Sequence, residues 1–539
     1  MPQQRWSFRR PREPQWWRWC GWALLISLVH RLVIAAWLPL GFDEAYYYLY
    51  TLHPNWSYFD HPPLVGWVAE LGIALTGQVS PLTLRLGSLL LYTASSLLLA
   101  LSAKHLFSER AGRLTLALAA GIPIFSVAFG SLILPDSPLI FFWSLTLYLA
   151  ALEFFPASPV PNRPYNPTWK LTLICLSVGL ACLGKYHGLA LGFGLTLFCL
   201  GQVKYRQVFT SPYFAVGVGL FLLCWLPILY WNSQHDWISL RYQGQRAGEE
   251  GSSFTWSNLA ITLAKAIAYL FPSFGIPLWG VALVRLSQLG RRYYGRAEIY
   301  ALILSISLPL VLVMTVVGGW RDILPTWPMP GFWALTLLLA ESADRHWEKW
   351  QIWLRPSWWI SIILILGAQL LALAHISFGL LQKPNPIHPS LAFIPIQEDA
   401  STQLIDIHQL RQNVVEDSEL FQVLESADFM FTNHYFLGGQ IATALVPVLH
   451  KPVTCYAEDL RGFAFWSDPE DFIGKTGVLI TSAQFENLDG KGDPITIYSP
   501  YFESFEFLAE VPIIRGGAIA QQFRFYLGKN QQLPYPRPY

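Results

Sequence analysis

Residues 41–64, GFDEAYYYLYTLHPNWSYFDHPPL, decide how the rest of the chain is interpreted. They directly follow an apolar run of membrane-spanning length, and they combine acids and a histidine with many aromatic residues and a Pro-Pro pair. A plain connecting loop needs polar turn residues and little else, whereas aromatic rings favour the membrane–water boundary. The stretch therefore predicts a functional loop at the edge of a membrane.

The composition supports a membrane protein. Of 539 residues, 53% are hydrophobic and only 13% are charged, where a soluble domain carries about 25% charged residues. The net charge of +1 gives no basic field for nucleic acid. The six cysteines form no CxxC pair, so neither a zinc site nor a disulfide framework is indicated.

Apolar runs place the membrane spans. Runs near spanning length lie at residues 19–38, 82–103, 111–129, 137–155, 170–184, 187–203, 212–231, 298–317, 327–341 and 357–380. A longer run at 257–284 is interrupted by Pro272 and Pro277, which predicts a kinked span or shorter pieces. We expect about eleven crossings, or about thirteen if short segments pair up. Residues 64–75 are expected to lie along the membrane surface.

Charges in the loops set the expected orientation. Arginines at positions 5, 9, 10, 12 and 18 place the N-terminus in the cytoplasm, because cytoplasmic loops collect basic residues. An odd number of spans then puts the C-terminus outside the inner or plasma membrane. After a proline-rich linker the composition becomes that of a soluble domain. We therefore predict a transmembrane domain at 1–381, with its first outer loop at 41–64, and an extracytoplasmic α/β domain at 382–539.

Short patterns in the C-terminal region predict individual elements. Strands are expected at Phe429–Thr432, Val453–Tyr456 and Gly477–Thr481, and a helix at Tyr435–Val446. The fold class is thus an α-helical polytopic membrane protein with a C-terminal soluble α/β domain.

Unusual ionisable residues gather in the loops predicted to face outward. They are Asp43, Glu44, Asp60, His61, Asp136, Lys185, Arg241 and Arg321. Each has an ordinary alternative. Asp43 and Glu44 would simply end a helix at the interface, Asp60-His61 would form a turn, Asp136 would cap a helix, and Lys185 would extend to the interface. Their convergence on one side favours a site that handles a phosphate beside a lipid.

Several of these motifs resemble a known superfamily. They are Asp43-Glu44-Ala45-Tyr46-Tyr47, Tyr58-Phe59-Asp60-His61-Pro62-Pro63-Leu64, Leu134-Pro135-Asp136-Ser137-Pro138-Leu139, Gly184-Lys185-Tyr186 and Trp327-Pro328-Met329-Pro330. Their order resembles that of the bacterial protein O-mannosyltransferase and aminoarabinose-transferase superfamily, which are membrane glycosyltransferases of C-type fold. His61 stands where the aminoarabinose transferases carry a lysine, which argues against an aminoarabinose donor and a lipid A acceptor.

The resemblance implies transfer of a sugar from a polyprenyl-phosphate donor to a lipid, glycan or protein acceptor on the outer face. Asp43, Glu44 and Asp60 are then the expected catalytic acids, with Asp43 or Asp60 activating the acceptor in an inverting displacement. His61, Lys185, Tyr186, Arg241 and Arg321 are the expected donor-phosphate ligands. The resemblance names no definite cofactor. The one option is a divalent metal (Mg²⁺ or Mn²⁺) held by Asp43 and Asp136, with Asp60, because hard cations take carboxylate and phosphate oxygens.

Two other classes of protein stay open at this point. A transporter or flippase of lipid-linked sugars also needs many spans and charges at membrane depth. Its binding site would lie near the midplane, however, whereas these ionisable residues gather on one face. A membrane scaffold with a partner-binding outer domain is the third class.

Overall fold

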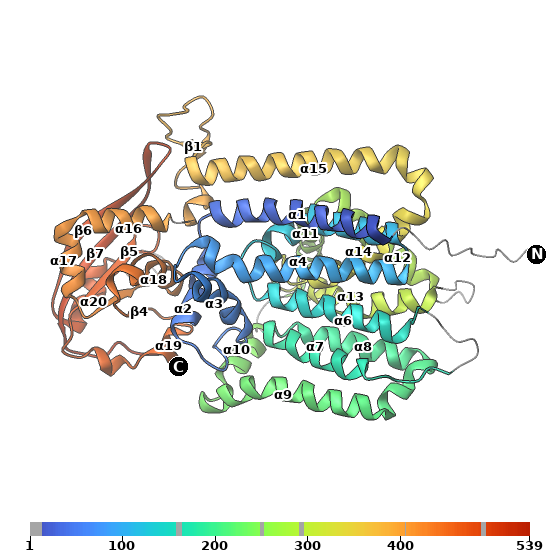
Figure 1. The fold of residues 1–539 in the computed structure, drawn as a ribbon. Helices are drawn as coiled ribbons and strands as arrows, with labels where there is room; N and C mark the ends of the chain where they lie inside the picture. Colours follow the sequence, from blue (N-terminus) through green and yellow to red (C-terminus); the bar gives the residue numbers. More distant parts are fainter. Residues whose placement is uncertain are drawn as a thin grey trace, which may run out of the picture.

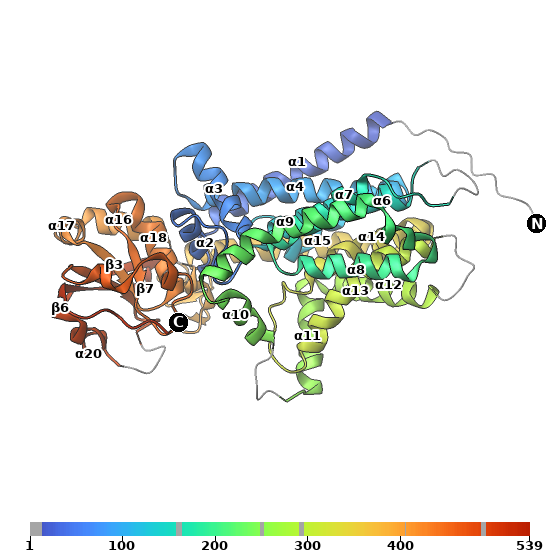
Figure 2. The same ribbon diagram turned by 90° about the horizontal axis from the view of Figure 1, so that it is seen from below.

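The computed structural model describes residues 13–157, 164–247, 253–289, 296–404, 406–486 and 492–538. Long helices run side by side, and a sheet-containing domain sits at one end of this bundle (Figures 1 and 2). The described part of the chain has six helices that are long and apolar enough to cross a membrane. They are α1 (Glu13–Trp37), α4 (Pro81–Leu106), α6 (Asp136–Phe154), α9 (Pro212–Gln234), α13 (Ala297–Val317) and α15 (Trp347–Phe378).

If each of two bent pairs of helices is a single span, this number rises to eight. The pairs are α8 (Gly188–Gly201) with η2 (Val203–Thr210), bent by 120°, and α11 (Trp256–Tyr269) with α12 (Pro272–Gln288), bent by 115°. Pro272 begins α12, so the predicted break lies where the proline cannot continue a helix.

Other expected spans form shorter helices. They are α5 (Glu109–Gly121) with η1 (Ile124–Phe129), α7 (Lys170–Gly184) and α14 (Met329–Arg345). The multi-pass membrane class is confirmed, and the exact number of crossings stays a prediction. The orientation also stays a prediction, and the arginines at positions 5, 9, 10 and 12 lie outside the described residues.

The stretch at 41–64 is only partly a loop. Its first half forms α2 (Phe42–Leu52), and α3 (Leu64–Thr76) follows the Pro-Pro pair. Gly41 is the N-cap of α2, and its backbone N–H donates to the carboxylate of Glu44 at 3.1 Å. The 13 residues of α3 span about 20 Å, too little to cross a bilayer, as expected of a surface segment.

The C-terminal domain is built on a five-stranded sheet of order β4-β3-β5-β7-β6. β3 (Phe429–Thr432), β4 (Val453–Cys455) and β5 (Gly477–Ser482) are parallel, which confirms the three predicted strands. The antiparallel hairpin of β6 (Phe502–Arg515) and β7 (Ala518–Gln531) was not predicted. Its turn is made by Gly516 and Gly517, both at positive φ.

The remaining elements are short or connect the two parts. They are α10 (Ile238–Ala247), β1 (Gln382–Lys383), β2 (Ile394–Pro395), η3 (Ala400–Gln403), α16 (Ile407–Glu416), α17 (Ser418–Ser426), α18 (Tyr435–Leu449), α19 (Phe463–Trp466), η4 (Pro469–Phe472), α20 (Pro494–Tyr498) and η5 (Ser499–Tyr501). The observed α18 confirms the helix predicted after β3.

Helix α18 joins the C-terminal domain to the bundle by packing on α2. A Cβ added at Gly439 would lie 2.6 Å from the backbone of Ala45 and Tyr46, so the two helices touch through this glycine. Phe42 stacks on Phe436, with ring centroids 5.2 Å apart. Apolar residues of both parts form one cluster, so the C-terminal domain is packed against the bundle and not merely tethered to it.

This close approach predicts that Gly439→Ala destabilises the protein. The added methyl group meets backbone, which cannot move aside as a side chain can, so we expect a cost of about 1–3 kcal/mol. Gly219→Ala in α9 is the matched control, because nothing lies within 4 Å of its added Cβ. Thermal unfolding of both variants in detergent measures the effect, and equal melting temperatures would contradict the contact.

Candidate active site

A cavity of about 470 Å³ lies where the bundle meets the C-terminal domain. It collects side chains from nine separate stretches of the chain, between Asp43 and Arg461. They include Asp43, Tyr46, Tyr47, Asp60, His61, Asp136, Lys185, Tyr186, His187, Gln243, Trp327, Tyr435 and Arg461. The structure thus brings Asp43, Asp60 and Lys185 together in one hollow, as the convergence of loops predicted.

Asp43 is the carboxylate that opens onto this cavity. It lies in the first turn of α2 and its side chain is exposed. Among the residues that the structure describes, none donates a hydrogen bond to it or pairs with it. Although the cavity admits solvent, surrounding protein raises the pKa of this carboxyl, and the nearby charge of Asp60 raises it further. Arg461 and Lys185 partly offset this rise.

Glu44 is not a cavity residue, contrary to the expected catalytic role. Successive side chains of a helix are rotated by about 100°, so the side chain of Glu44 points into the bundle while that of Asp43 points out. Glu44 is buried and forms a two-pronged pair with Arg85, at 2.7 Å to Oε1 and 2.5 Å to Oε2. The backbone N–H of Ile133 also donates to it at 2.9 Å. Glu44 therefore holds α2 against the bundle.

Asp60 lines the cavity but is already well bonded. Its carboxylate accepts hydrogen bonds from Tyr50 at 2.8 Å and Tyr46 at 3.2 Å, and it pairs with Arg461 at 3.4 Å. Only 4% of the residue is exposed. His61 beside it lines the cavity and lies edge-on to the ring of Tyr47, at 5.7 Å between centroids. Of the two expected bases, Asp43 is thus the more available.

Asp136 and Lys185 form a buried ion pair in the cavity wall. The Lys185 Nζ lies 2.8 Å and 3.0 Å from the two carboxylate oxygens of Asp136. Pro135, not Asp136, is the N-cap of α6, and Lys185 is 6% exposed. The two ordinary alternatives, a helix cap and an interfacial lysine, therefore do not describe these residues.

The other expected phosphate ligands divide between cavity and surroundings. Tyr186 lines the cavity, and its hydroxyl lies 3.3 Å from that of Ser239. Arg241 is exposed on α10, away from the cavity lining. Arg321 lies behind the wall, 5.9 Å from the ring of Trp327. The structure therefore places both Arg241 and Arg321 outside the cavity lining. The residue of α10 that lines the cavity is Gln243.

Arg461 is the cationic residue that sequence reasoning missed. It comes from the C-terminal domain, between β4 and α19, and it lies over the ring of Tyr435 at 4.5 Å and over Tyr242 at 5.2 Å. It pairs with Asp60, which stands some four hundred positions earlier. No local motif marks it, since Asp459-Leu460-Arg461 has the composition of any surface turn.

The cavity does not match the expected metal site. Lys185 occupies both oxygens of Asp136, and hard divalent cations need several oxygen ligands that are not already committed. The described residues include no group of three or more His, Cys, Asp or Glu side chains placed to hold a metal. We therefore derive no step that uses a metal ion.

Comparison with known proteins finds similar sequences for part of this chain. Residues 60–231 match the family described as dolichyl-phosphate-mannose-protein mannosyltransferase. The resemblance to the superfamily of membrane glycosyltransferases drawn from the motifs is therefore confirmed. A lipid A galacturonosyltransferase of Rhizobium johnstonii is 25% identical over 313 residues, which are 57% of this chain and 61% of that relative. The chain thus matches less than two thirds of the relative's length.

Solved structures with a similar arrangement include an oligosaccharyltransferase of Archaeoglobus fulgidus. With zinc and sulfate bound, it is 12% identical, with a TM-score of 0.47, and covers 91% of this chain and 72% of its own. The complex of that enzyme with an inhibitory peptide and a dolichol-phosphate has the same TM-score and identity.

The contrast between Asp43 and Glu44 yields a prediction on stability. Glu44→Gln leaves Arg85 buried without its counter-charge, which costs about 3–5 kcal/mol. Asp43→Asn removes a carboxylate whose pKa the fold raises, so stability at neutral pH should stay the same or rise. Thermal unfolding of the two variants side by side measures this difference. A melting temperature for Glu44→Gln equal to that of the parent chain would contradict the structural role.

Proposed function

We propose that the chain is a membrane glycosyltransferase that moves a sugar from a polyprenyl-phosphate donor to an acceptor, with Asp43 as the general base. One observation carries this proposal. Asp43 is a carboxylate that none of the described residues pairs with; it faces a cavity at the end of the bundle, has a raised pKa, and shares that cavity with cations held in place by other acids. A base with a raised pKa works closer to neutral pH than an ordinary aspartate.

The proposed reaction is a single inverting displacement. Asp43 takes the proton of the acceptor hydroxyl or amine, and the freed electron pair attacks the anomeric carbon of the sugar. The bond from that carbon to the phosphate oxygen breaks, and polyprenyl phosphate leaves with the electron pair. Every other group in the cavity then serves to hold the reactants or to stabilise the leaving phosphate.

Lys185 and Arg461 are suited to the leaving phosphate. Each lines the cavity and is held by an acid, Asp136 and Asp60 respectively, so each is in place before the donor arrives. Such preorganised cations stabilise developing charge without rearranging during the reaction. His61 also lines the cavity, beside the ring of Tyr47. A guanidinium also suits a phosphate because its N–H groups form a planar fork.

The membrane setting of the reaction is part of the proposal. We propose that the N-terminus lies in the cytoplasm, so that the cavity and the C-terminal domain face outward from the inner or plasma membrane. The matched relative acts on lipid A by its name, and the matched family on protein. The acceptor is accordingly proposed to be a lipid, glycan or protein of the cell envelope. A flippase would need its site near the midplane, whereas this cavity adjoins the C-terminal domain.

Loss of the base should abolish transfer. Asp43→Asn is expected to lower kcat/KM by about 100- to 10,000-fold, the usual contribution of a general base. The assay uses purified protein and a panel of polyprenyl-phosphate sugars as sole donors, with envelope lipid and glycan fractions as acceptors. Asp322→Asn is the control, because its carboxylate is 78% exposed and pairs with Lys265. Unchanged transfer by Asp43→Asn would remove Asp43 from the mechanism.

The pH dependence of transfer offers a second test. Activity should rise with pH as Asp43 loses its proton, with the acidic limb above the ordinary aspartate pKa of 3.8. Arg461 lowers the pKa of Asp43, so Arg461→Gln should move this limb to higher pH as well as slow the reaction. The profile of kcat/KM against pH measures both effects. A slower reaction with an unmoved limb would show that Arg461 does not act on Asp43.

A further inference from the structure

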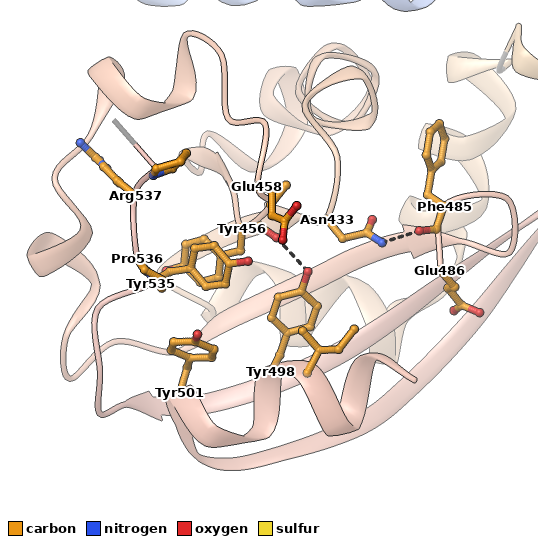
Figure 3. Close-up of a pocket in the computed structure, with 13 residues that line it drawn as sticks. Asn433, Tyr456, Glu458, Phe485, Glu486, Tyr498, Tyr501, Tyr535, Pro536 and Arg537 are labelled. Atoms are coloured by element: carbon orange, nitrogen blue, oxygen red, sulfur yellow. Dashed lines mark hydrogen bonds between the residues drawn. The ribbon is translucent and has the colours of Figure 1, made fainter. Parts of the chain in front are cut away.

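A second cavity, of about 410 Å³, lies wholly within the C-terminal domain (Figure 3). Its volume is in the usual range for small-molecule sites, roughly 300–1,000 Å³. It opens where β3, β4 and β5 end. Asn433 follows β3, Tyr456 and Glu458 follow β4, and Phe485 comes after β5.

The topology of the sheet marks this position as a binding site. The chain runs from β3 to β4 on one side, then returns to β5 on the other side of β3, and all three strands are parallel. In open α/β sheets, ligands bind at the carboxyl ends of the strands where the connections diverge in this way. The amide of Asn433 joins the two sides, since it donates to the carbonyl oxygen of Phe485 at 2.8 Å.

The aromatic C-terminal segment, which had no assigned role, forms one wall. Tyr535 stacks on Tyr456 with ring centroids 4.6 Å apart and planes within 2° (Figure 3). Tyr501 lies 5.1 Å from Tyr535. Arg537 holds the segment by donating to the carbonyl oxygen of Ala464 at 2.5 Å. Tyr501 and Tyr535 are half-buried, so their rings still present surface to the cavity.

Acidic groups lie opposite these rings. Glu458 is exposed, and Glu486 is paired with Arg524 at 2.5 Å. Carboxylates accept hydrogen bonds from hydroxyl groups, and aromatic faces pack against the C–H face of a sugar ring. The combination suits a neutral sugar. Glu486 is already offset by Arg524, so Glu458 and Arg537 are the remaining charges of the lining, and together they give no net attraction for an anion.

The two cavities are neighbours. Glu458 of the second cavity and Arg461 of the first are three residues apart, so their Cα atoms lie within about 11 Å. Phe485 of the second cavity also contacts Phe42, the residue before Asp43, with ring centroids 5.6 Å apart.

We propose that this second cavity binds a neutral sugar unit of the acceptor, so that the C-terminal domain selects a glycan and presents it to Asp43. The binding of a sugar is independent of the proposed transferase activity. Only the statement that this sugar belongs to the acceptor rests on the proposed function. The C-terminal domain then binds part of the substrate, in addition to forming one wall of the first cavity.

The test is direct binding by the full chain in lipid nanodiscs, which avoids maltoside detergents because their headgroup is itself a sugar. Methyl glycosides of glucose, galactose, mannose and N-acetylglucosamine are offered singly, and saturation-transfer NMR detects contact with their ring protons. Free galacturonate is the anionic comparison. We expect at least one neutral glycoside to bind, and Tyr535→Ala and Glu458→Gln each to weaken it at least tenfold.

Control variants separate this site from the catalytic cavity. Phe507→Ala removes an aromatic side chain of the same domain that is 48% exposed and lies outside the cavity, and it should leave binding unchanged. Asp43→Asn should also keep sugar binding while it loses transfer. The proposal is overturned if no neutral glycoside binds, if Tyr535→Ala and Glu458→Gln bind as well as the parent chain, or if galacturonate binds equally well.

Discussion

The buried pair of Glu44 and Arg85 is the constraint on which the site depends. Arg85 also donates to the carbonyl oxygens of Ala35, in the last turn of α1, and of Leu38 and Pro39, just after it. One guanidinium thus joins α4, the end of α1 and the start of α2. An ion pair with so many additional hydrogen bonds offsets the cost of removing both charges from water. Because α2 is held in this way, Asp43 has to face the cavity.

A second network joins α2 to the C-terminal domain. The hydroxyl of Tyr46 donates to Asp60 and accepts from the backbone N–H of Gly462, while Arg461 reaches back to the same aspartate. Catalytic and positioning groups from both ends of the chain therefore share hydrogen bonds. The cavity exists only when the two parts are docked, which explains why α18 approaches α2 so closely at Gly439.

The charges of the cavity are arranged to leave one acid available. Three carboxylates and two permanent cations line it, and two of the carboxylates are paired with those cations. Asp43 is left with surrounding protein and the negative charge of Asp60, which raise its pKa and prepare it to take a proton. The same pairs hold Lys185 and Arg461 at the positions where a phosphate would need them.

The sequence by itself determined the membrane class, most helix positions, three strands of the C-terminal sheet and the gathering of Asp43, Asp60, Asp136 and Lys185. These features follow from local apolar runs, prolines and strand patterns, and from alternation of loops across a membrane. Only the tertiary structure decided the roles within the site. Asp43 and Glu44 are adjacent and chemically alike, but the helix turns them to opposite environments. Arg461 and the tyrosines around Tyr535 gain their positions from contacts between distant segments, which no local pattern encodes.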